Sequence, residues 1–73
     1  MPMWISTQNT VGFDHVILEE DDNAGVYIYV YETPASKTPE QDHLQDDLEM
    51  AQNACQEDFG IPRTSWHPLK GQS

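Results

Sequence analysis

Alternating apolar and polar positions dominate the chain between residues 13 and 32. Two runs there, Asp14–Glu19 and Val26–Tyr31, are rich in β-branched and aromatic residues, which is typical of β-strands. The polar residues between the runs end in Gly25, a residue that can adopt a positive φ in a turn. The pattern predicts a β-hairpin over about residues 13–32, with a loop somewhat longer than two residues.

The hairpin runs sort their side chains by type onto two faces, because successive strand residues point to opposite sides. One face is aliphatic and carries Val16, Leu18, Val26, Ile28 and Val30. The other face gathers aromatic rings beside one isoleucine: Ile17, Tyr27, Tyr29 and Tyr31. We expect the aliphatic face to pack on a helix and the tyrosine face to remain open.

A helical period follows the hairpin. Apolar residues recur at steps of three and four and form a single helical stripe: Leu44, Leu48, Ala51, Cys55 and Phe59. Thr38 and Pro39 suit the N-cap and the first helical position, and Gln41 suits the reciprocal position of a capping box. Gly60 followed by Pro62 is a typical helix stop. The sequence therefore predicts one helix over about residues 39–59.

The two ends of the chain carry weaker patterns. Residues 2–12 leave two alternatives open: Met3, Trp4 and Ile5 add a third strand, or this segment covers the tyrosine face. Residues 60–73 have no periodicity and are expected to form an irregular tail, in which Ile61 and Trp66 fold back onto the core. The whole chain, residues 1–73, then reads as one small α+β domain, a hairpin sheet packed on one amphipathic helix.

The net charge of the chain limits the kinds of partner that we expect. Thirteen Asp and Glu against three Lys and Arg give a net charge of -10. Nucleic acid and anionic membrane surfaces are polyanions that bind through Lys and Arg, so neither is expected as a direct partner. A lone cysteine, Cys55, and the absence of a long apolar run favour a cytoplasmic location.

Few residues of the sequence are spaced as catalytic or metal-binding residues usually are, and we predict no catalytic, cofactor-binding or metal site. The three histidines lie far apart in the sequence, without the close His and Cys spacing of a zinc site. Ser65, His67 and Asp58 occur without a nucleophile elbow or an oxyanion signature. Cys55 lies on the apolar stripe, where a thiol acts as a small hydrophobic side chain. The chain is therefore predicted not to be an enzyme.

Two surfaces remain as candidate binding sites. The interface candidates are Ile17, Tyr27, Tyr29 and Tyr31, because aromatic-rich exposed patches mark protein interfaces. They predict a non-enzymatic interaction domain that forms a homodimer. The alternative is a nucleic-acid mimic or immunity-type inhibitor that presents an acidic helix face to a basic protein. The candidates for that face are Asp42, Asp46, Glu49 and Glu57.

A resemblance rests on three features: the run Val26–Tyr31, the acidic helix with Leu48, Ala51 and Cys55, and the ending Phe59–Pro62 followed by Trp66. With these features the chain resembles a loose group of small bacterial proteins of unknown function over roughly residues 14–66. The resemblance implies a bacterial source and brings no activity or functional residue with it.

Overall fold

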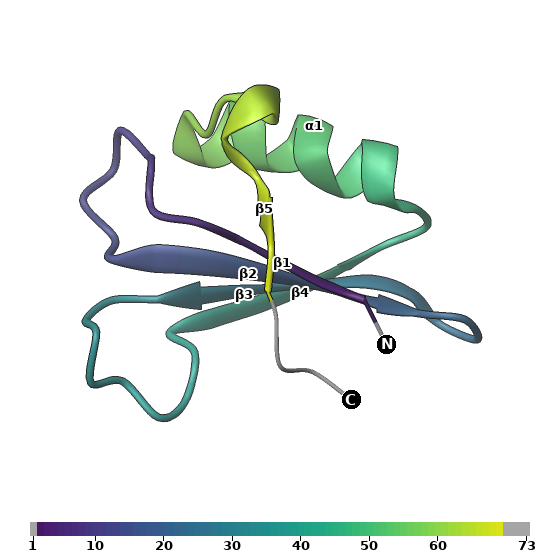
Figure 1. Cartoon of the computed structure of the whole chain (residues 1–73), viewed down its shortest axis with the longest axis horizontal. Coiled ribbons are helices and arrows are strands. Elements are labelled where there is room, and N and C mark those ends of the chain that lie inside the picture. Colours follow the sequence, from purple (N-terminus) through teal and green to yellow (C-terminus); the bar gives the residue numbers. More distant parts are fainter. Residues whose placement is uncertain (1, 70–73) are drawn as a thin grey trace.

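An antiparallel sheet with one helix on one face makes up the fold of the computed structural model, which describes residues 2–69. The elements follow in the order β1 (Met3–Ser6), β2 (His15–Asp21), β3 (Gly25–Tyr31), β4 (Gln41–Gln45), α1 (Leu48–Phe59), a 3₁₀ turn η1 (Arg63–Ser65) and β5 (His67–Pro68). In space the strands are ordered β4-β3-β2-β1-β5. Figure 1 shows α1 above the sheet, with the other face of the sheet directed away from it. The α+β class predicted from the sequence is confirmed.

The hairpin is formed by β2 and β3, which pair Val16 with Val30 and Leu18 with Ile28. Its turn spans residues 22–24, and one Asp21 carboxylate oxygen accepts the backbone N–H groups of the turn at 2.8 and 3.1 Å. Gly25 follows the turn with φ of 120°. This conformation favours glycine, as the sequence pattern predicted.

The core lies between the aliphatic face of the sheet and α1. Every aliphatic residue assigned to that face is buried, and so are Ala51, Cys55 and Phe59 of the helix. Ile61 and Trp66 fold back and close the core at its C-terminal side, as predicted. Next to them the Oγ atoms of Ser6 and Ser65 lie 2.8 Å apart, so these buried hydroxyls share a hydrogen bond.

The N-terminal segment extends the sheet and does not cover the tyrosine face. Residues Met3–Ser6 pair with β2, which resolves the open alternative in favour of a strand. On its other side β1 pairs with β5, and the N–H of Leu69 donates to the carbonyl of Met3 at 2.8 Å.

The predicted start of the helix is wrong. The helix begins at Leu48, with Asp47 as N-cap accepting the N–H of Met50 at 2.8 Å, and residues 41–45 form β4. Leu44 therefore lies on a strand and is 52% exposed instead of packing in the core. The helix ends at Phe59, and Gly60 adopts the left-handed conformation with its N–H directed at the carbonyls of the last turn.

Two physical reasons favour the strand over the predicted helical turns. A helix over this segment would stack Asp42 on Asp46 at i, i+4 with no nearby Lys or Arg, which is unfavourable. Pairing with β3 instead satisfies backbone groups on what would be the open edge of the hairpin. Long-range pairing outweighs the local capping pattern around Thr38 and Pro39.

Candidate functional site

The face of the sheet opposite α1, called here the open face, carries a cluster of apolar and aromatic side chains. Its register places aromatic and aliphatic side chains of four adjacent strands on one side: Met3, Ile5, Ile17, Tyr27, Tyr29, Tyr31 and Leu44. No element within residues 2–69 covers it (Figure 1). All of these side chains are half-buried by their neighbours except Leu44, which is exposed.

Ring contacts organise the open face. The rings of Tyr27 and Tyr29 are stacked with centroids 5.9 Å apart, and His15 stacks on Tyr31 at 4.6 Å and 9° between planes. Such pairs hold the rings in fixed orientations, which reduces the entropy that a partner would have to remove on binding. The open face is therefore an ordered aromatic platform.

One carboxylate lies within this platform and orders its central ring. The Tyr29 hydroxyl donates to Oε1 of Glu19 at 3.3 Å. Burial raises the pKa of Tyr29, and the negative charge and hydrogen bond of Glu19 raise it further. The hydroxyl therefore stays protonated at neutral pH and remains a donor. Asp42 lies directly opposite Tyr29 on β4 and adds a second carboxylate to the same face.

The structure brings together the interface candidates Ile17, Tyr27, Tyr29 and Tyr31, and adds residues that the sequence reasoning missed. Ile5 pairs with Ile17, and Leu44 pairs with Tyr27, so both extend the patch. Met3 joins it from β1 beside Glu19. The alternation of side chains in β1 could have predicted that Met3 and Ile5 join the patch. Leu44 could not be predicted there, because its spacing also fits a helix.

Acidic side chains gather at one end of the sheet, where the β2–β3 turn meets the junction between β4 and α1. They line a cleft of about 330 Å³ and are called here the acidic end: Glu20, Asp21, Asp22, Asp46 and Asp47. Three of these carboxylates already accept hydrogen bonds from the chain. Glu20 accepts the Trp4 indole N–H at 2.8 Å, and Asp21 and Asp47 cap the turn and the helix.

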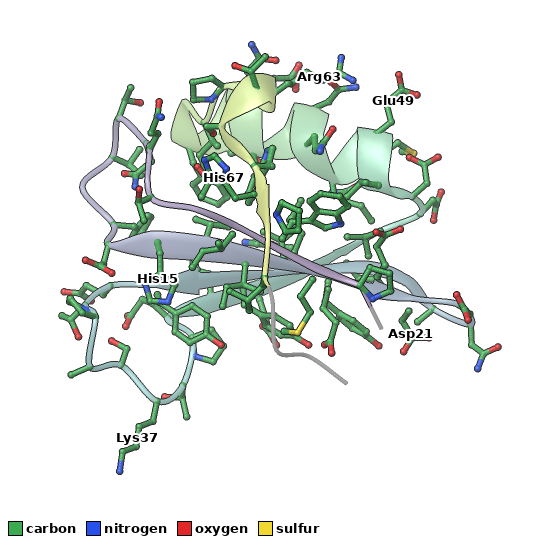
Figure 2. All side chains as sticks on the ribbon, in the orientation of Figure 1. His15, Asp21, Lys37, Glu49, Arg63 and His67 are labelled. Atoms are coloured by element: carbon green, nitrogen blue, oxygen red, sulfur yellow. The ribbon has the colours of Figure 1, made fainter. Side chains whose placement is uncertain are left out.

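The four candidates for an acidic helix face do not form one helical row. Asp42 lies on β4 and Asp46 precedes α1, so only Glu49 and Glu57 are helical. Glu49 lies 3.8 Å from the exposed guanidinium of Arg63 (Figure 2). The predicted acidic helix face is therefore wrong, because Asp42 lies on a strand and Asp46 lies before the helix begins.

The residues considered for metal binding or catalysis do not come together within the described chain. Among residues 2–69, no three His, Cys, Asp or Glu side chains are grouped to hold a metal ion. The buried Ser65 hydroxyl donates to the carbonyl of Pro62 at 2.7 Å and contacts Ser6, whereas His67 is exposed on β5. Ser65 is thus engaged in holding η1 to the sheet.

Cys55 should resist alkylation in the folded protein. Burial raises the pKa of its thiol to about 12, with the nearby Asp58 charge adding to the effect. The reactive thiolate is then scarce at pH 8, and the sulfur is fully buried. We expect iodoacetamide labelling followed by mass spectrometry to be at least about tenfold slower in native buffer than in guanidinium, since the unfolded thiol has an ordinary pKa. Equal rates would show that Cys55 is accessible.

None of the helices among residues 2–69 is long and apolar enough to cross a membrane. No protein-family model, curated protein or solved structure matches the chain. The resemblance to small bacterial proteins therefore stays a prediction.

Proposed function

We propose that this protein is a non-enzymatic interaction domain that self-associates by packing its open face against the open face of a second copy. The observation that carries the proposal is the patch of apolar and aromatic side chains that β1 to β4 place on one face, with the carboxylates of Glu19 and Asp42 among them. A two-fold interface buries the same patch on both copies at once, so one surface supplies both sides of the contact.

The size of the molecule bears on this proposal. The molecule extends 31 by 25 by 20 Å. Stable interfaces bury roughly 800 Å² per partner, so a stable dimer of this protein has to use the whole open face. A domain of this length also has little stability in reserve, and dimerisation is one way in which small domains gain it.

Net charge opposes association. Each copy brings a charge of -10, and two such copies repel each other. Salt screens this repulsion, so the dimer should tighten as ionic strength rises. This salt dependence is the reverse of what an acidic protein shows with a basic partner.

Sedimentation at micromolar concentration tests the proposal, with wild type expected to sediment as a dimer. Tyr29→Ser removes the central ring and should weaken association at least about 30-fold, the roughly 2 kcal/mol typical of a central interface tyrosine. Because Tyr29 also contacts Tyr27 and Glu19, its effect on folding is followed separately by circular dichroism at a dilution where wild type is monomeric.

A matched pair separates interface loss from general loss of hydrophobicity. Leu44 and Met50 are similarly exposed, at 52% and 44%, but Leu44 lies on the open face and Met50 on the helix. Leu44→Ser should weaken the dimer, whereas Met50→Ser should not. A monomeric wild type at all concentrations and salt levels would refute self-association. If that monomer captured a basic protein at low salt, the inhibitor alternative would be favoured.

A further inference from the structure

Both ends of the strands are acidic, but their charges differ, because the end with Asp14, Glu32 and Glu40 also carries a lysine. The acidic end lies at the start of β3, and the loop of residues 32–40 lies beyond the other end of that strand. This loop carries Lys37, one of only two Lys or Arg residues within residues 2–69. Figure 2 shows Lys37 projecting past the sheet on the side away from α1, with Asp21 at the opposite end.

Lys37 cannot reach the acidic end of its own chain. The seven residues of β3 separate the two, which at about 3.3 Å per residue is more than 20 Å. Within residues 2–69 the close contacts between basic and acidic side chains are His15 with Asp14 and Arg63 with Glu49, so Lys37 takes part in neither. Its side chain extends into the space that a second copy packed on the open face would occupy or border, since packed sheets lie about 10 Å apart.

We propose that the two copies pack with the strands of their facing sheets antiparallel, so that Lys37 of each copy meets the acidic end of the other. This inference rests on the proposed self-association and specifies its orientation. The reverse orientation would bring the two acidic ends together and place Lys37 beside Lys37. Electrostatic complementarity of this kind selects the orientation of an interface even when it contributes little affinity.

Zero-length coupling with a carbodiimide tests the orientation, because it joins a lysine amine to a carboxylate only when the two touch. The reaction uses a mixture of ¹⁴N- and ¹⁵N-labelled wild-type protein, so that mixed-isotope peptides identify links between copies. We expect Lys37 to be joined to Asp21, Asp22 or Asp46 of the other isotope. Links from Lys37 to Asp14, Glu32 or Glu40 of the other copy would establish the opposite orientation and overturn the inference.

A charge-matched pair of variants gives an independent measurement. Lys37→Glu and Arg63→Glu change the net charge equally, but Arg63 lies on the helix side of the molecule. We expect Lys37→Glu to weaken the dimer about tenfold more than Arg63→Glu. The reason is that a two-fold interface contains the Lys37 contact twice, so the substitution removes both. The difference should shrink in high salt.

The outcomes distinguish this inference from the proposal beneath it. A wild-type dimer in which both variants are equally weakened, or in which Lys37 forms no link between copies, would leave self-association intact and refute the antiparallel orientation. A protein that is monomeric in sedimentation at every concentration would refute both.

Discussion

Replacing Gly25 with alanine should lower the free energy of unfolding by about 3 kcal/mol or more. At φ of 120° a side chain is strained whatever space surrounds it. Space is also missing, because an added Cβ would overlap the backbone carbonyl oxygen of Gln45. That oxygen belongs to β4, so relief of the clash requires β3 and β4 to separate at this point.

Gly12 provides the control for Gly25→Ala. It has a comparable positive φ of 94°, but no atom lies within 4 Å of the position of its Cβ. Gly12→Ala should cost only the conformational part, about 1–2 kcal/mol. The difference between the two variants, measured by urea unfolding at a concentration where the protein is monomeric, isolates the clash. Equal losses would show that the contact between Gly25 and Gln45 does not constrain the fold.

Truncation of Ile28 to alanine should cost about 2–5 kcal/mol, which is a large part of the stability of so small a domain. Ile28 is 1% exposed, lies at the centre of β3 opposite Leu18, and faces α1. Deleting three of its carbons leaves a cavity that the fixed backbone of the sheet cannot fill. The expected result is a lower urea midpoint with little change in the slope of the transition.

A matched valine pair tests whether burial causes the loss. Val30→Ala and Val11→Ala delete the same two methyl groups, but Val30 is fully buried and Val11 is 50% exposed. Val30→Ala should be clearly destabilising, whereas Val11→Ala should lie within about 0.5 kcal/mol of wild type. Similar values for the two would mean that the aliphatic face of the hairpin is not the core.

Local patterns predicted the parts of the fold that local physics determines. The hairpin, the sorting of aliphatic and aromatic side chains onto two faces, and the glycine at the end of α1 each depend on residues close together in sequence. The tyrosine patch followed from strand alternation alone. For the same reason the buried state of Cys55 could be inferred from its place on the helical stripe.

The remaining features depend on contacts between distant residues. A segment with Leu44 at helical spacing and a capping pattern at Thr38 satisfies the local rules for a helix, and only the unpaired edge of β3 makes a strand preferable. The same pairing moved Asp42 from a helix face to the open face. The acidic end, likewise, exists because the β2–β3 turn and the start of α1 meet in space.

The pairing of β1 with β5 has a consequence for the kinetics of folding. Trp4 and Pro68 are neighbours across these strands, although almost the whole described chain separates them in sequence. Closing so long a loop lowers the chain entropy before the contacts between its ends can stabilise the structure. Sheets with such pairings therefore fold slowly, in milliseconds to seconds. During synthesis, the edge of β1 that pairs with β5 has no partner until residues through Leu69 have left the ribosome.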